Sequence, residues 1–366
     1  MNIKINRDVL LKPLADVSGI VEKRHALPIL SNLLLEGENG VLKFTATDLE
    51  VQISLSIKTD IKESFKTTIA ARKLFDITRA LPEESILDIQ IDDSKVVVKA
   101  RKSRFNLQTL PAKDYPVMVK NEGENISFSV PQNQLKSLLK QVDFSMAQQD
   151  IRYYLNGLLF EVDGKKLNIV ATDGHRLSFT STNLNEPQEK TQIIVPRKTI
   201  IELTKLMGDD DQLIKISVTK NQVAFKFNDI DLITKVIDGK FPDYNRVIPE
   251  GHSNVFDVDR LSLLSSMQRA SILSNEKYRG IRMVIEENNL KLISSNSEQE
   301  QAEEELEIKY TGTTIDIGFN VTYLIDVLVN IQFDKLTFAF NDSSSSCLIT
   351  IPNNDDYKYV VMPMRI

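Results

Sequence analysis

The sequence is poor in the residues that disulfides, metal centres and histidine-dependent active sites need. It has one cysteine and three histidines among 366 residues. The lone Cys347 cannot form an intramolecular disulfide, so a reducing cytoplasm is the expected environment. The phosphate-binding P-loop, the GxSxG nucleophile motif and the HExxH zinc spacing do not occur. We therefore expect no metal and no cofactor.

Long apolar runs are absent as well. No stretch approaches the roughly 18 apolar residues of a membrane-spanning helix. The opening MNIKINRDVL lacks the apolar segment of a secretion signal, so we expect neither a leader nor a membrane partner. With 42% hydrophobic and 26% charged residues, the composition is that of a soluble globular protein. The length suggests about two or three domains.

Acidic residues outnumber basic ones, so the net charge is −6. Taken alone, this argues against nucleic-acid binding, because phosphate contacts need cations. The field around a protein depends on where charges lie, however, and an acidic protein can carry one basic surface. The acids concentrate in turns such as EGENG, PEES and GDDD, while many lysines and arginines fall on expected helices. We expect relatively positive helices and strongly negative outer loops.

One pattern of roughly 120 residues occurs three times along the chain. In each copy two alternating strands flank a turn rich in Asn, Asp, Glu or Gly, which is a hairpin signal. These hairpins span residues 27–53, 153–178 and 277–303, with the anchors Asp48, Asp173 and Asn296 in equivalent places. A second pattern of strand, helix and two strands starts near Thr68, Ile193 and Ile315. Each copy thus holds two similar modules.

Apolar stripes at helical spacing indicate two helices in each copy. The stripes are Leu10, Leu14, Val17 and Val21; Leu74, Ile77 and Leu81; Leu135, Leu138, Leu139 and Val142; Ile200, Leu203 and Met207; Leu263, Met267 and Ala270; and Val321, Leu324, Ile325 and Leu328. Asn6 is a suitable N-cap for the first helix. Pro13 lies inside that helix and is expected to kink or shorten it.

The repeats predict an α+β fold of three similar domains, over residues 1–124, 125–251 and 252–366. Each domain is a doubled helix-plus-antiparallel-sheet module. Two arrangements are compatible with this pattern. The domains could follow one another as ordinary duplicates. Alternatively, the sheets of successive modules pair edge to edge and form an arc, and a head-to-tail dimer covers the free edges and closes a ring.

Two of the expected helices begin with basic pairs, Arg72–Lys73 in ARK and Arg197–Lys198 in PRK. The helix dipole disfavours an exposed cation there by about 0.3–1 kcal/mol. Repetition of the pair fits helix ends that are presented to phosphates, which favour helix N-termini. Solvated surface charges explain the pairs equally well. Because the chain has no helix-turn-helix, zinc-finger or aromatic stacking motif, any DNA contact should be independent of base sequence.

The stretch ATDGHRL places Thr172, Asp173 and His175 together, as a hydrolase would. The repeat argues against catalysis, because Asp173 corresponds to Asp48 in ATDLEV, which no histidine follows. An aspartate shared by repeated modules is better explained by a turn, since Asp commonly binds its own backbone. The methionine-rich terminus VVMPMRI instead favours a surface for varied partners. We expect no enzyme activity, with hydrolysis as the alternative.

Several segments closely resemble the bacterial sliding clamps, the β subunits of the replicative DNA polymerase III holoenzyme. They are DIRYYLNGLLFE, ATDGHRL, VPRKTIIEL, DGKFPDYNRVIP, SILSNEKYRGIR and YVVMPMRI, and the resemblance covers the whole chain. It implies a ring-shaped homodimer of DNA-clamp domains, with helices lining a hole around duplex DNA. Such a ring slides and tethers the polymerase, which raises the effective concentration of polymerase on DNA. It is expected in the cytoplasm, at the nucleoid.

The resemblance also assigns roles to residues. By this resemblance the DNA contacts would be Arg24, Arg72, Gln149, Tyr153 and Tyr154. The other residues of the basic pairs, Lys73, Arg197 and Lys198, are expected to contact DNA as well. A pocket would bind short apolar peptides of the polymerase catalytic subunit, the clamp loader, translesion polymerases and repair proteins. Its residues would be Leu155, Thr172, Gly174, His175, Arg176, Leu177, Pro242, Arg246, Val247, Val360, Met362, Pro363, Met364 and Arg365. The dimer joint would pair Phe105 and Leu107 with Ile272 and Leu273, flanked by basic Arg101, Lys102 and Arg104 and acidic Glu298, Glu300, Glu303 and Glu304.

Overall fold

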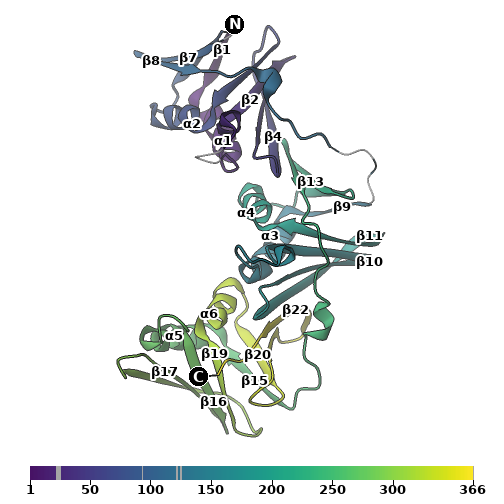
Figure 1. Ribbon diagram of the computed structural model, residues 1–366, viewed down its shortest axis with the longest axis vertical. Helices are drawn as coiled ribbons and strands as arrows, with labels where there is room; N and C mark the ends of the chain where they lie inside the picture. Colours follow the sequence, from purple (N-terminus) through teal and green to yellow (C-terminus); the bar gives the residue numbers. More distant parts are fainter. Residues whose placement is uncertain (22–25, 93, 121–122, 124–125, 366) are drawn as a thin grey trace. The chain divides into compact units, whose positions relative to one another are not determined.

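A computed structural model describes residues 1–366 except 22–25, 93, 121–122, 124–125 and 366 (Figure 1). Contacts divide the chain into two units. The first comprises Met1–Gln134 and Ile201–Val236, and the second Leu135–Ile200 and Ile237–Ile366. Both units combine helices with antiparallel sheets, as the α+β prediction requires. The domain bounds proposed from the sequence stay a prediction.

The first unit contains two sheets, with strand orders β1-β6-β7-β8 and β5-β2-β3-β4-β14-β13-β12-β9. Its elements, with η for short 3-10 helices, are β1 Asn2–Asn6, α1 Arg7–Ser18, η1 Pro28–Ser31, β2 Asn32–Glu38, β3 Val41–Thr47, β4 Val51–Lys58, β5 Phe65–Ala70, α2 Ala71–Ala80, β6 Ile86–Ile91, β7 Lys95–Ala100, β8 Ser103–Gln108, η2 Ala112–Asp114, β9 Ile126–Pro131, β12 Leu213–Val218, β13 Gln222–Phe227 and β14 Ile230–Lys235. The helices α3 Gln132–Val142 and α4 Arg197–Leu206 contain residues of both units.

The second unit also contains two sheets, with orders β10-β11-β22-β21-β20-β15 and β18-β17-β16-β19. Its elements are η3 Asp143–Ser145, η4 Tyr153–Leu155, β10 Gly157–Thr172, β11 Arg176–Pro196, η5 Tyr244–Arg246, β15 Asn254–Asp259, α5 Arg260–Ala270, η6 Ser271–Leu273, β16 Gly280–Glu286, β17 Asn289–Ser295, β18 Gln301–Glu307, β19 Ile315–Asn320, α6 Val321–Asn330, β20 Lys335–Phe340, β21 Cys347–Ile351 and β22 Asn354–Val361.

The larger sheet of each unit runs across a predicted domain boundary. In the first unit β4 pairs with β14, which places Ile53 opposite Leu232. In the second unit β11 pairs with β22, and Leu177 lies opposite Val360. Strands of neighbouring domains therefore share one hydrogen-bonded ladder. This pairing confirms the expectation that sheets of successive modules meet edge to edge.

Helix α1 shows how local signals and packing combine. The Asn6 side chain accepts the Asp8 amide at 2.7 Å, which confirms the predicted N-cap. Pro13 does not end the helix, which continues to Ser18. Pro13 is itself buried between Leu10 and Leu14 on the core-facing stripe. Its apolar packing offsets the backbone hydrogen bond that its ring removes.

The α1–α2 pair and the α5–α6 pair are each held together by an equivalent arginine contact. Helix α1 lies beside α2, and α5 beside α6 (Figure 1). Arg7, at the start of α1, donates to the Thr78 carbonyl near the end of α2 at 3.2 Å. Arg260, at the start of α5, donates to the Leu328 carbonyl of α6 at 2.8 Å. A cation at a helix C-terminus complements the helix dipole. Because both helix pairs have this contact, the repeat includes side-chain contacts as well as secondary structure.

Cys347 lies in the apolar core of the last domain, packed among α5, α6 and their sheets. Its side chain is fully buried, and burial raises the pKa of the thiol. We therefore expect a thiol reagent to modify the folded protein at least about 100-fold more slowly than the protein in urea, because the thiolate and access to it both require unfolding. Labelling followed by mass spectrometry measures both rates. Rapid labelling of the folded chain would contradict this burial.

No helix within the described part of the chain is both long and apolar enough to cross a bilayer. The same described residues contain no cluster of three or more His, Cys, Asp or Glu side chains suited to a metal ion.

Candidate functional site

The turn between β10 and β11 is fixed by its own side chains. Thr172 donates from Oγ1 to the Arg176 carbonyl at 2.6 Å and accepts the Gly174 amide at 3.1 Å. Asp173 accepts the amides of His175 and Arg176 on Oδ1, at 2.9 and 3.0 Å. Two of the three side chains that a hydrolase would use, Thr172 and Asp173, are therefore engaged with the backbone.

The first repeat builds the same turn between β3 and β4. Thr47 donates to the Val51 carbonyl at 2.9 Å, and Asp48 accepts the amides of Glu50 and Val51 at 2.9 and 2.7 Å. This match confirms that the shared Thr-Asp pair fixes a turn. The His175 ring stacks on Tyr323 with centroids 6.5 Å apart. The arrangement is that of a structural turn and not of an acid–base pair.

Arg176 connects this turn to α6. Its guanidinium pairs with Asp173 at 3.1 Å and Asp326 at 2.6 Å, and donates to the Phe144 carbonyl at 2.6 Å. It also lies 4.5 Å from the centre of the Tyr323 ring. Burial opposes the charge, but Tyr359 and the two carboxylates outweigh it and raise the pKa of Arg176. A permanently charged, saturated arginine thus holds one wall of the site in place.

A mainly apolar, partly open cavity of about 150 Å³ lies beside the turn. It is lined by Arg152, Tyr154, Leu155, Thr172, Gly174, His175, Arg176, Leu177, Pro242, Tyr244, Val247, Val360 and Met362. Four segments meet there: η4 with the residue before it, the β10–β11 turn, the loop around η5, and the end of β22. The Met362 amide donates to the His175 carbonyl at 2.9 Å, which fixes the last segment against the turn.

Most of the predicted pocket residues line this cavity, and the exceptions have structural reasons. Arg246 is exposed and pairs with Asp243 at 2.9 Å. Beyond Met362 the chain leaves the cavity, because the Met364 amide donates to the Gly318 carbonyl at 2.8 Å. Met364 and Arg365 line a separate hollow over β16 and β17, and Pro363 lies between the two sites.

Sequence reasoning missed Arg152 and Tyr244 as lining residues, and it placed Tyr154 among the DNA contacts. Arg152 holds Asp150 in a two-point contact at 3.0 and 2.9 Å, and this contact lowers the pKa of Asp150 to about 2. Its guanidinium also donates to the Asp173 carbonyl at 3.1 Å. The motifs RYYLNG and FPDYNRV contain all three residues, but a motif does not reveal which side chains turn inward.

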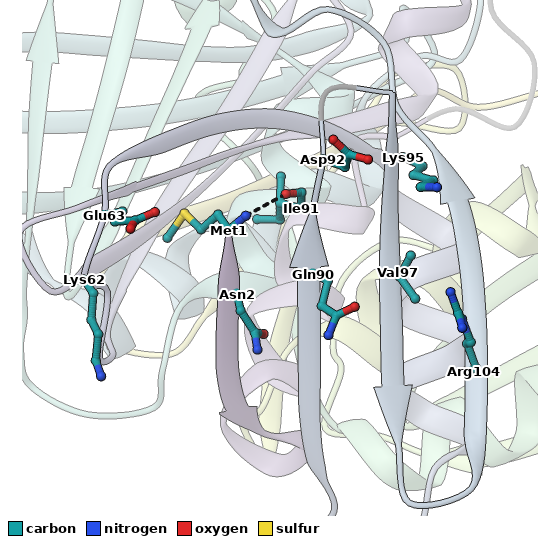
Figure 2. A pocket seen from close by; sticks show the side chains of 10 residues that line it. All are labelled: Met1, Asn2, Lys62, Glu63, Gln90, Ile91, Asp92, Lys95, Val97 and Arg104. Carbon is teal, nitrogen blue, oxygen red and sulfur yellow. Dashed lines mark hydrogen bonds between the residues drawn. The ribbon is translucent and has the colours of Figure 1, made fainter.

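A larger hollow of about 740 Å³ lies over β1, β6 and β7 (Figure 2). Its labelled side chains carry both charges, including Lys62, Glu63 and Asp92 (Figure 2). The Met1 amino group donates to the Ile91 carbonyl at 3.0 Å, which ties down the chain start. Ligand sites are typically apolar with a few placed polar groups. The smaller cavity fits that description better than this open, charged hollow.

The predicted DNA contacts lie in several environments. Tyr153 is 73% exposed on η4, and Lys73 is exposed at the start of α2. Exposed Arg72 donates to the Val21 carbonyl at 2.9 Å. The predicted contact Arg24 lies outside the described residues. Gln149 is exposed and has a φ of 55°.

Arg197 differs from these exposed side chains. It is partly buried and donates to the carbonyls of Asp143 and Met146 at 3.4 and 3.3 Å. The neighbouring Lys198 is also partly buried. In both contacts the donor is Nη1 of the guanidinium, and the two carbonyls belong to the first residue and the C-cap residue of η3.

The residues predicted for the dimer joint lie on or near two sheet edges. β8, which carries Arg104, Phe105 and Leu107, is the last strand of its sheet, and β18 is the last strand of another. Arg101 and Lys102 form the turn before β8. Ile272 is 76% exposed and Leu273 partly exposed on η6. Glu304 pairs with Arg269 and Glu303 with Lys291, whereas Glu298 and Glu300 are exposed in the turn before β18.

Comparisons with known proteins agree over the whole chain. Family models described as the N-terminal, central and C-terminal domains of the DNA polymerase III beta subunit match residues 1–119, 129–243 and 245–365. The beta sliding clamps of Pseudomonas aeruginosa and Escherichia coli K12 are 45% and 41% identical, with 100% of each chain covered. A crystal structure of DNA polymerase III subunit beta from P. aeruginosa has a TM-score of 0.96 at 45% identity, again covering 100% of both chains.

These matches decide the function class. Sliding clamps are ring-shaped homodimers of helices and antiparallel sheets that encircle DNA and keep the replicative polymerase on it. They are processivity factors without catalytic activity, and no match favours the hydrolase alternative. The chain belongs to the DNA polymerase III beta subunit family, the sliding clamps.

Proposed function

We propose that the cavity beside the β10–β11 turn is where this clamp holds its partners, through short apolar peptide segments. The observation that carries the proposal is the mainly apolar lining of this cavity, to which Leu177, Val247, Val360 and Met362 contribute. Met362 is 43% exposed, and its flexible thioether suits partners of different shape. The partners are the polymerase catalytic subunit, the clamp loader, translesion polymerases and repair proteins, which compete for the site.

The proposal extends to DNA and to the second copy of the chain. Exposed Lys73, Arg72 and Tyr153 would meet the DNA backbone loosely, because tight phosphate contacts would stop sliding. In the dimer the edge of β8 in one copy meets β18 in the other, with the basic turn of Arg101 and Lys102 opposite acidic β18. Free sheet edges favour this pairing, since unpaired strands invite further strands. The protein would act in the cytoplasm, at the nucleoid. Each copy would consist of three clamp domains.

Retention on circular DNA tests the central function. The protein is loaded onto a nicked circle with a clamp loader and ATP, isolated by gel filtration, and half of the sample is then cut with a restriction enzyme. We expect the circle to keep at least about tenfold more protein than the linear product, because a ring is held by topology and leaves over free ends. Bulky blocks on the linear ends should restore retention. Equal loss from cut and uncut DNA would replace encirclement by ordinary binding.

A further inference from the structure

A buried carboxylate lies behind the wall of the partner cavity. Glu161, on β10, is only 7% exposed and has no cation among its hydrogen-bond partners in the described structure. It accepts the Gln192 side-chain amide at 2.5 Å, the Asn168 amide at 3.1 Å and the Tyr244 hydroxyl. A buried charge is costly unless hydrogen bonds satisfy it. This set of donors is therefore a built feature of the fold.

The equivalent glutamate of the first repeat has a different environment from Glu161. Glu36 of SNLLLEGENG occupies the place of Glu161 in LNGLLFEVDGKK. Across the ladder Glu36 faces Lys43 and Lys66, and it pairs with Lys66 at 2.8 Å while 30% exposed. Glu161 instead faces Gln192 on the neighbouring strand. Neutral amides have replaced the lysines, and a tyrosine hydroxyl covers the carboxylate.

The tyrosine belongs to the cavity wall. Tyr244 begins η5, and its carbonyl accepts the amides of Val247 and Ile248 at 3.1 and 3.3 Å. Tyr244, Pro242 and Val247 all line the cavity. The Tyr244 ring also packs against Phe179, with centroids 5.8 Å apart. The hydroxyl is thus a side-chain anchor that ties this loop to the sheet from behind.

The protonation state agrees with this geometry. Burial would raise the pKa of Glu161, but the Tyr244 hydroxyl, the two side-chain amides and, least, the charge of Lys190 outweigh burial and hold it below the usual value. Burial and the adjacent carboxylate also raise the pKa of Tyr244, so the tyrosine keeps the proton that it donates.

We propose that Glu161 is a positioning residue of the partner site: through Tyr244 it holds residues 241–247 against the sheet, and so sets peptide affinity without touching the peptide. This inference rests on the proposed role of the cavity in peptide binding. The wall carries Pro242 and Val247, and a displacement of either would open the cavity on one side.

Three variants and one repeat-matched control test the proposal. Glu161→Ala, Tyr244→Phe and their combination are compared with Glu36→Ala, which removes the equivalent carboxylate of the first repeat. Affinity is measured by fluorescence anisotropy with a labelled peptide that carries the clamp-binding segment of this organism's polymerase III catalytic subunit. Hydrogen exchange of the Val247 and Ile248 amides reports on the wall itself.

We expect each single variant to weaken peptide binding at least about fivefold. The double variant should be no weaker than the worse single one, because both remove one shared interaction. Exchange at Val247 and Ile248 should accelerate in all three, and Glu36→Ala should change neither readout. Tyr244→Phe keeps the ring and serves if Glu161→Ala does not fold.

Two outcomes would overturn the proposal. Unchanged exchange at Val247 and Ile248 would show that Glu161 does not hold the wall. Lower melting temperatures with wild-type peptide affinity would leave Glu161 a purely structural role. If the wild-type protein binds no peptide, the proposed function fails, and the exchange measurement still decides whether Glu161 positions the wall.

Discussion

Replacing Ile272 and Leu273 by alanine should convert the dimer into monomers. Ile272 is 76% exposed in the isolated chain. An apolar side chain of this size that stays in contact with water contributes no burial free energy. Burying a large aliphatic side chain contributes about 1.5–3 kcal/mol. A ring closed by two identical joints loses this contribution from both residues at both joints. The dimer constant should therefore weaken by at least about 1,000-fold.

The apolar pair should matter more than the charges around it. Glu304 already pairs with Arg269 and Glu303 with Lys291 within the same chain. Exposed ion pairs contribute little and are screened by salt. Mass photometry from nanomolar to micromolar concentration measures the dimer directly. Leu261→Ala, at a side chain 57% exposed on α5, is the matched control and should leave the dimer intact. A double variant that dimerises like the wild type would remove η6 from the joint.

Local repetition made part of the site predictable. The Thr-Asp turn could be inferred because ATDLEV and ATDGHRL share it, and a side chain that fixes a backbone turn acts over a few residues. The core-facing stripes were predictable for the same reason. Leu263, Met267 and Ala270 are fully buried although their stripe is the least regular in the sequence. Periodicity over one helix requires no knowledge of distant partners.

Contacts between distant segments were not predictable in this way. Gly174 illustrates the limit: its φ of +90° suits glycine, and a Cβ there would lie 3.0 Å from the Arg152 guanidinium. The turn signal suggests the positive φ, but not the arginine that lies over it. The Glu161–Tyr244 bond joins residues that β11, α4 and the three strands β12 to β14 separate in the chain. The apolar periodicity of the two segments does not predict this hydrogen bond.

The path of the chain end also escaped sequence reasoning, and it sharpens the test of the partner cavity. The motif VVMPMRI treats its methionines alike, whereas Met362 lines the cavity and Met364 lies over another sheet. Deleting residues 362–366 should weaken partner-peptide binding by at least about 30-fold, because it removes the methionine at the cavity mouth. Residues that anchor an interface contribute about 2 kcal/mol or more to binding. The anisotropy assay above measures the loss, and mass photometry should show an intact dimer.

A shorter deletion separates the two methionines. Removing only residues 364–366 keeps Met362 and its amide contact with the His175 carbonyl at 2.9 Å. If the cavity alone holds the peptide, this variant should bind within about threefold of the wild type, since surface changes away from an anchor contribute little. Equal losses from both deletions would mean that the peptide continues past the cavity along Met364 and Arg365. The pair of variants thus distinguishes one anchoring cavity from an extended groove, which the shared motif could not do.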